Sequence, residues 1–347
     1  MDTRQRILRE GGVMMAVANQ KLSERWKTPA GVELTQRVIK ELLDPAGDLA
    51  SLPLERHEDR VDLRGIRMGS ELPLPSGITA GGYMVEEITT PLDAHGVEFS
   101  AIDFTGSSLN SLRFKDCRIV NCLFDEADCR DWRTWGLEVV DSNFSNTAMR
   151  ACHLGTWNEG DRSTYVRVDF SGADLKSSFF SYADFRDCDF SYADVDQLDF
   201  RSACFRGCRF AGHLRGTVFW SLPPNSEATD HNLMARVDFR DATLRFVEFR
   251  GLDLRDVTLP HSNQYIKVAQ YPCVMRLAPD RLRGLPGRNG NRAARLLERQ
   301  TRWINSKRDV GIWHEEDLAS SKEECELVRE VLHSCERECD TNHATDR

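Results

Sequence analysis

The sequence predicts a mainly β protein whose middle half is a regular solenoid, with helical segments at both ends. Three observations support this prediction. A large apolar residue recurs at every fifth position between residues 95 and 261, and a small or β-branched residue stands two places before it. Outside this range the period is lost, apart from one repeat-like unit at residues 59–68. Every other predicted element is placed by where the period starts, slips and stops.

The period of five excludes both a continuous helix and a continuous strand. Five helical steps of about 100° rotate each apolar residue by about 140°, and an odd period in a strand alternates between its two faces. In extended chain, side chains two apart point the same way, so each unit has one small and one large inward residue. The chain must therefore turn a corner every five residues. Fifteen of the seventeen phenylalanines stand at these centres or at Phe219. The clearest predicted core is formed by Phe170, Phe180, Phe185, Phe190, Phe200, Phe205 and Phe210.

The units "ADLKS", "ADFRD", "ADVDQ", "VDFRD" and "LDLRD" show the pattern best. Through them the chain resembles the pentapeptide-repeat family over roughly residues 95–261. The resemblance implies a right-handed, four-sided β-helix with about twenty residues per coil, stacked at about the strand spacing of 4.8 Å. One branch of this family binds type II topoisomerases by resembling duplex DNA in width and negative charge, so such an enzyme is one implied partner.

Four regions follow from the period. Residues 1–58 are expected to be a helical N-terminal region that caps the solenoid, with "VELTQRVIKELLDP" as its clearest helix. Residues 59–94 hold a first repeat-like strand, "DRVDLRGIRM", and then a Pro- and Gly-rich insertion. Residues 95–261 are the β-helix, with loops at 155–163 and 211–235 where the register slips. Residues 262–347 are expected to be a C-terminal cap followed by a basic and then an acidic helix.

The two C-terminal helices suggest an antiparallel hairpin within one chain, or the same pairing between two chains of a homodimer. Terminal coils expose strand edges and apolar core, which is why caps are expected at both ends.

Composition places the chain among cytoplasmic globular proteins. Its net charge is −9, and 40% of residues are hydrophobic and 29% charged. The apolar run "VMMAVA" near the start is too short for a membrane span or a signal peptide. Most of the eleven cysteines fall in the repeat, where a free cysteine packs as a small hydrophobe. The mildly acidic middle argues against direct nucleic-acid binding by the solenoid.

No catalytic or cofactor motif is visible, so no catalytic residue is predicted and no cofactor is expected. One metal-binding alternative exists at the tail. Cys335, Cys339 and His343 are spaced by four and share a helix face, with Cys325 as a fourth candidate. Such a set could hold zinc or iron and support a metal-dependent enzyme or modifier.

Two functional hypotheses remain besides that enzyme. The first is a non-catalytic interaction or scaffold protein that binds a protein partner through aromatic residues near the irregular segments, namely Trp135, Trp157 and Trp220. In the alternative reading, Trp132 and its neighbours plug a widened coil. The second is a DNA-mimic regulator or protector of a type II topoisomerase, in which Asp174 and Asp194 belong to an acidic ridge. Arginines after many repeat centres, such as Arg186 and Arg206, half neutralise that ridge.

Overall fold

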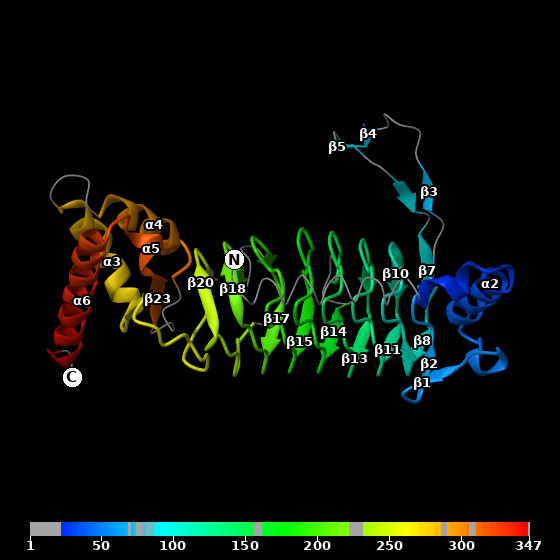
Figure 1. Cartoon of the computed structure of the whole chain (residues 1–347). Coiled ribbons are helices and arrows are strands. Elements are labelled where there is room, and N and C mark those ends of the chain that lie inside the picture. The colour runs from blue at the N-terminus through cyan, green and yellow to red at the C-terminus, as the bar shows by residue number, and fades with distance from the viewer. Residues whose placement is uncertain are drawn as a thin grey trace. The chain divides into compact units, whose positions relative to one another are not determined.

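A computed structural model describes residues 22–68, 71–73, 79–80, 83–84, 87–89, 91–155, 162–221, 232–285, 290–304 and 310–345. The chain divides into two compact units, Met1–Phe179 and Phe180–Arg347, and each is described by itself. In both units short parallel strands recur with the predicted spacing, which makes a β-helix (Figure 1).

Backbone pairing shows how the coils stack in the first unit. Arg118 pairs with Glu138 and also with Glu98, so neighbouring coils are in register at a spacing of twenty residues. Parallel pairings with the next coil recur at four places in each coil, for example at residues 103, 108, 113 and 118. The strands of this unit are β1 (Arg56–His57), β2 (Arg60–Asp62), β3 (Glu71–Pro73), β4 (Thr79–Ala80), β5 (Tyr83–Met84), β6 (Glu87–Thr89), β7 (Leu92–His95), β8 (Glu98–Ser100), β9 (Ile102–Asp103), β10 (Leu112–Lys115), β11 (Arg118–Val120), β12 (Arg133–Trp135), β13 (Glu138–Val140) and β14 (Ser163–Val166).

Each corner is made by a residue in the left-handed region. A positive φ recurs two places after most centres, as at Gly106 after Phe104 and Asn146 after Phe144. In many units the amide of the following small residue donates to the carbonyl of the centre, as from Ala127 to Phe124 at 2.9 Å. A turn of this kind, with its third residue at positive φ, favours Gly, Asn and Asp. Gly, Asn or Asp occupies about half of these corners, and other residue types, such as Ser111, Tyr192 and Gln197, adopt the same positive φ, so the turn recurs every five residues with or without a favoured residue type.

The phenylalanines pack inside the coils in columns. Phe124 stacks on Phe144 with ring centroids 4.4 Å apart, and in the second unit Phe190 stacks on Phe210 at 4.9 Å. All seven phenylalanines named as core above are buried. One coil reverses the sizes of its inward pair, because Trp132 takes the small position and Thr134 the centre, and both are buried. The Trp132 ring fills the coil against Phe114, Phe124 and Phe144.

Insertions lengthen three coils without breaking the ladder. Val61 pairs with Ile102 across the segment that contains β3 to β6, so β2 lies in the first coil. Val139 pairs with Tyr165, six residues beyond the regular spacing, and Phe219 pairs with Phe249, ten beyond it. The predicted loop at 211–235 was wrong in its first part, because β18 and β19 continue the coil there. The register slips since one unit, from Phe210 to Leu214, has four residues instead of five.

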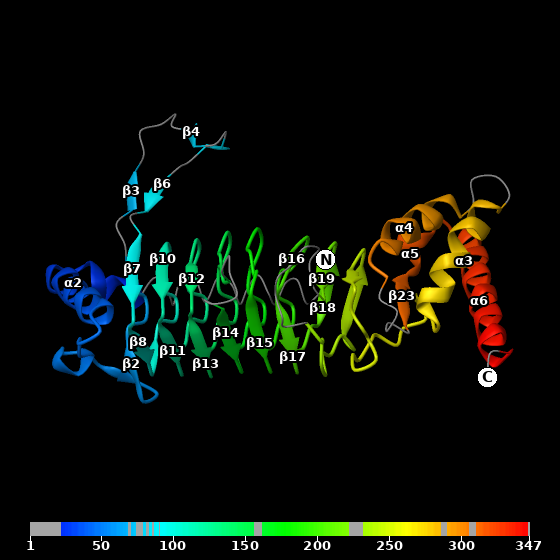
Figure 2. The same ribbon diagram turned by 180° about the vertical axis from the view of Figure 1, so that it is seen from behind.

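The second unit contains the later coils and a mixed C-terminal region (Figure 2). Its elements are β15 (Ala183–Arg186), β16 (Asp199–Phe200), β17 (Cys204–Arg206), β18 (Gly212–Arg215), β19 (Val218–Trp220), β20 (Ala242–Arg245), β21 (Glu248–Arg250), β22 (Tyr265–Val268), α3 (Tyr271–Arg283), α4 (Asn291–Thr301), β23 (Gly311–His314), α5 (Glu315–Leu318) and α6 (Lys322–Thr345).

Helical residues at the start contact the outer edge of the first coil. Residues 22–27 are helical, α2 spans Pro29–Leu43, and the 3-10 helix η1 spans Leu49–Ser51. The Thr28 hydroxyl accepts from the Gly31 amide, which begins α2. Arg25 donates to the carbonyl oxygens of Asp62 and Arg64, and the Trp26 indole donates to Arg64 at 2.8 Å. These donors satisfy carbonyls that have no further coil to bind.

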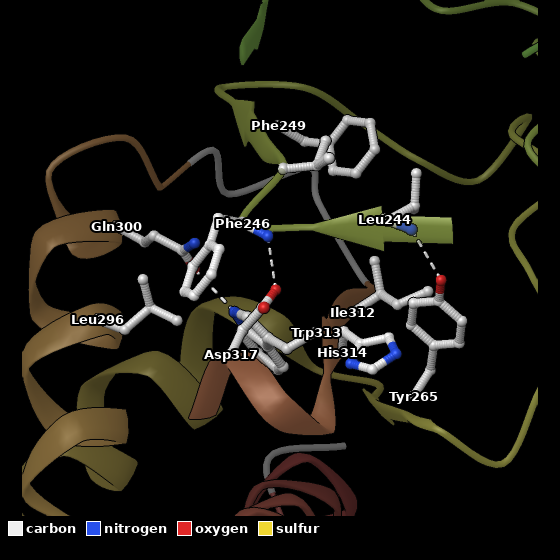
Figure 3. A pocket seen from close by; sticks show the side chains of 11 residues that line it. Leu244, Phe246, Phe249, Tyr265, Leu296, Gln300, Ile312, Trp313, His314 and Asp317 are labelled. Atoms are coloured by element: carbon white, nitrogen blue, oxygen red, sulfur yellow. Dashed lines mark hydrogen bonds between the residues drawn. The ribbon is translucent and has the colours of Figure 1, made fainter. Parts of the chain in front are cut away.

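The C-terminal region supplies acceptors to the last coil (Figure 3). The amide of Leu244 donates to the Tyr265 hydroxyl at 2.8 Å, and that of Phe246 donates to the Asp317 carboxylate at 2.6 Å. Between the coil and this region lies a cavity of about 10 Å³, which is room for about one water molecule. The site in Figure 3 is therefore a structural junction and holds no space for a substrate.

The predicted C-terminal hairpin of a basic and an acidic helix differs from the structure. The basic segment forms α4 only as far as Thr301, and β23 pairs antiparallel with β22 before α6 begins. The acidic helix α6 packs against α3. A disulfide between Cys273 and Cys339 and an ion pair between Arg281 and Glu338 join these two helices. The apolar residues of α6 therefore pack within their own chain, in one cluster with those of α3.

Candidate partner-binding surface

One face of the first unit gathers basic and aromatic side chains. It is formed by the parallel strands β7, β10 and β12, which Figure 2 shows side by side. Arg113 of β10 pairs with Asp93 on one side and Arg133 on the other, and Lys115 pairs with His95 and Trp135. Since alternate residues of a strand share a face, these six side chains point outward together. We call the set Asp93, His95, Arg113, Lys115, Arg133 and Trp135 the β10 face.

The β10 face is hollowed. A depression of about 480 Å³ is lined by Asp93, Ala94, His95, Arg113, Lys115 and Trp135. Ala94 is buried at its floor, and Trp135 is half-buried at its side. The hollow can therefore receive a side chain of a partner against one aromatic surface and two cations.

The arginines of this face are fixed by one carboxylate. Arg113 donates to Asp131 Oδ2 at 2.8 Å, and Arg133 lies 3.4 Å from its Oδ1. Burial raises the pKa of Asp131, but the hydrogen bonds from Arg113 and Ser111 outweigh it, so the pKa lies below its usual value. Asp131 thus stays ionised and holds two guanidinium groups in place, and these three side chains together carry a net charge of one positive. At the other edge, His95 Nε2 lies 3.6 Å from Asp116.

Two rings extend the β10 face along the next coils. His153 forms a parallel bridge with Arg133 and another with Phe179. The rings of His153 and Phe179 lie 4.8 Å apart, and 56% of Phe179 is exposed. Burial and the nearby Arg133 lower the pKa of His153, so this imidazole is neutral at pH 7 and serves as a partly apolar surface.

Comparison with known proteins agrees with the repeat seen in the structure. The family model described as pentapeptide repeats matches residues 169–207 in eight copies. The chain belongs to the pentapeptide-repeat family. No curated protein sequence matches it.

Several solved pentapeptide-repeat structures are similar over about half of the chain. Full-length QnrB1, a plasmid-mediated fluoroquinolone resistance protein, is 16% identical, with 48% of this chain and 82% of QnrB1 covered and a TM-score of 0.18. HetL from the cyanobacterium Nostoc is 16% identical, with 49% and 85% covered and a TM-score of 0.17. Rfr23 from the cyanobacterium Cyanothece is 8% identical, with 48% and 90% covered and a TM-score of 0.21. Such low scores carry no argument about what this pentapeptide-repeat protein binds.

The three tryptophans predicted as partner contacts have different positions. Trp135 lies on the β10 face, and Trp157 lies outside the described residues. Trp220 is only 2% exposed, which contradicts its prediction as an exposed aromatic. Its indole donates to Asp199 at 2.6 Å, and its ring packs edge-on against Trp303 at 4.8 Å. A residue distant in sequence therefore covers Trp220.

The two aspartates predicted for an acidic ridge lie in different units and are half-buried. Asp174 forms an ion pair with Arg150. Elsewhere in the pentapeptide repeats, surface carboxylates are also joined to arginines; examples are Asp141 with Arg167, Asp199 with Arg201, Asp241 with Arg209 and Asp253 with Arg255. These ion pairs neutralise much of the negative charge that the protein surface would need in order to imitate duplex DNA.

The predicted metal site at the tail was wrong at Cys339. Its sulfur is bonded to Cys273, so Cys339 offers no thiolate to a metal. Cys335 is buried among apolar residues, where burial raises the pKa of its thiol, and the His343 side chain lies outside the described residues. Within the described part of the chain, no group of three His, Cys, Asp or Glu residues is placed to hold a metal ion, and no helix is both long and apolar enough to cross a membrane.

Proposed function

We propose that this pentapeptide-repeat protein is a non-catalytic interaction protein that binds a protein partner through the β10 face. The observation that supports this most strongly is the hollow of about 480 Å³ in which Trp135 lies beside Lys115 and Arg113. Tryptophan and arginine are, with tyrosine, the residue types most enriched among the residues that dominate binding energy at protein interfaces. The family resemblance adds a right-handed, four-sided β-helix as the scaffold, closed by the helical regions at its two ends as caps.

Binding is favoured over catalysis by the openness of this surface. The side chains of His95 and Asp116 are 69% and 58% exposed, so water reaches both groups. General acid–base and electrostatic catalysis gain most where water is excluded. A shallow face made of rigid strands instead suits contact with a second macromolecule.

The test is partner capture from the native cell with the full-length protein. Trp135→Ala combined with Lys115→Glu should abolish capture of a specific protein. The matched control is Tyr192→Ala, which removes an aromatic ring that is 74% exposed in the other unit. Far-UV circular dichroism should show the same β signal for all three proteins. Equal capture by the double variant would exclude the β10 face as the binding surface.

The topoisomerase alternative stays a separate prediction. It requires a face on which negative charge accumulates, and the arginine pairs described above work against this. If it holds, micromolar protein should change gyrase supercoiling with or without a quinolone, and Asp174→Lys with Asp194→Lys should remove the effect. Unchanged supercoiling would exclude it.

Cellular setting and assembly are also proposed here. We place the protein in the cytoplasm, where disulfides are rare. Thiol labelling of Cys273 and Cys339 in intact cells tests this placement, because two cysteines that resist the label would be joined as in the structure and would count against the cytoplasm. A homodimer through the C-terminal helices would have to use surface that α3 and α6 do not bury against each other. Light scattering of the full-length protein decides between one chain and two.

A further inference from the structure

The outward residues of the first unit form two rows that run across the strands. The first row is Asp93, Arg113, Arg133, His153 and Phe179, which are successive partners in the parallel ladder. The second row is His95, Lys115 and Trp135. Four steps at the strand spacing make the first row roughly 19 Å long. We call these eight residues the binding strip.

The chemistry of the binding strip changes along its length. Its centre carries the cations Arg113, Lys115 and Arg133 together with the ring of Trp135, which lies on the same strand as Arg133, and one end carries the rings of His153 and Phe179. Its other end begins with the carboxylate of Asp93. A ligand that complements this order has negative charge in its middle and an apolar group at the ring end, and it avoids negative charge over Asp93.

We propose that the binding strip takes an extended acidic peptide segment of a partner protein, about six residues long, with carboxylates over the three cations and an apolar side chain against the rings of His153 and Phe179. The length follows from a strip of roughly 19 Å and a rise of about 3.3 Å per extended residue. This inference rests on the proposed function and adds the chemistry of the partner to it.

Charge favours a peptide over a nucleic acid. Three carboxylates, those of Asp93, Asp116 and Asp131, lie in or beside the binding strip. A continuous phosphate backbone would approach all of them, whereas a peptide can place its few acidic side chains over the cations alone.

The experiment measures fluorescence anisotropy with the purified full-length protein. The probe is a fluorescein-labelled peptide with the core Gly-Glu-Asp-Glu-Leu-Phe. Controls are the same peptide with lysines in place of its three acids, and a labelled twelve-nucleotide oligothymidine. We expect the acidic peptide to bind and the two controls to bind at least about tenfold more weakly, with affinity falling as salt rises.

Variants place the peptide on the strip. Lys115→Glu should weaken the acidic peptide by about tenfold or more and improve binding of the lysine peptide, because reversal of a charge repels one and attracts the other. Phe179→Ala should weaken the acidic peptide several-fold, whereas Tyr192→Ala leaves it unchanged. Lys115 and Phe179 are exposed, so these proteins are expected to fold normally.

The outcomes separate this inference from the proposed function. Binding of the acidic peptide that is lost in Lys115→Glu supports the inference. No binding of the acidic peptide, equal binding of the lysine peptide, or stronger binding of the oligothymidine overturns it. If any of these occurs while capture of the cellular partner still depends on Trp135, the proposed function stands and only the acidic segment is excluded.

Discussion

Asp317 is the residue whose loss should most clearly open the C-terminal end of the β-helix. It is 4% exposed, and its carboxylate accepts from the Phe246 amide at 2.6 Å and from Arg245 Nε at 2.9 Å. Asp317→Ala leaves the part-buried Phe246 amide without this acceptor, which costs about 1–3 kcal/mol. It also removes one partner of a partly buried ion pair, although Arg245 keeps Glu316 as a second partner. Together we expect a loss of about 2–4 kcal/mol.

The loss should be measured by thermal unfolding followed through tryptophan fluorescence, since Trp303 and Trp313 lie in the C-terminal region. For a unit of this size, about 2–4 kcal/mol corresponds to a decrease in Tm of roughly 5–15 °C. Asp317→Asn keeps an oxygen for the Phe246 amide but not the charge, and should lose roughly half as much. The control Asp253→Ala breaks an exposed pair with Arg255 and should cost about 1 kcal/mol or less. A decrease of about 1 °C or less for Asp317→Ala would refute the proposed role of this carboxylate.

Three further measurements test the packing. Phe205→Ala removes a buried ring that packs against Phe185 of the preceding coil and Phe200 of its own coil, and it should cost about 3–5 kcal/mol in urea unfolding. Phe179→Ala removes an exposed ring and should cost about 0.5 kcal/mol or less. Similar costs would contradict the inward column. Burial raises the pKa of Asp62, but hydrogen bonds from Arg64 and Arg25 outweigh this and hold the pKa well below its usual value. The contribution of Asp62 to stability is therefore complete above about pH 4 and is lost as the pH falls further. Asp62→Asn should remove this part of the acid dependence in a pH series of unfolding curves. Reduction of Cys273–Cys339, which are 66 residues apart, should lower stability by up to about 4 kcal/mol, and an unchanged Tm in reductant, with both thiols then alkylated, would contradict that.

The repeat could be predicted because it is a local pattern. Each unit contains its own inward pair and its own corner, so five residues specify one side of a coil without reference to distant parts of the chain. The exceptions are instructive. Trp132 and Thr134 exchange large and small positions, which keeps the filled volume of the coil but hides the centre from a search for bulky residues. The four-residue unit ending at Leu214 similarly looked like the start of a loop.

The sequence predicts the β10 face only in part, because its residues become neighbours through the twenty-residue spacing between coils and not through the five-residue period. Trp135 was recognised as an aromatic near an irregular segment, but Arg113 and Lys115 become its neighbours only when outward residues are compared at intervals of twenty. That comparison was available from the sequence, whereas the bridge from His153 to Phe179 crosses an inserted segment and breaks the interval.

The remaining errors involve contacts between residues far apart in sequence. Trp303 covers Trp220, and Cys339 is bonded to Cys273. Neither contact produces a pattern in the nearby sequence from which it could be predicted. Helical spacing placed Cys335 and Cys339 on one face of α6 but could not show that α3 would supply the partner of Cys339.

The most direct test of the account is photo-crosslinking in the native cell from position 135. Benzoylphenylalanine in place of Trp135 puts a reactive group inside the hollow, and the same substitution at Tyr192 puts one on an exposed surface of the other unit. We expect one dominant crosslinked protein from position 135, joined through an acidic segment and not seen from position 192. The same set of adducts from both positions, or none from position 135, would contradict it.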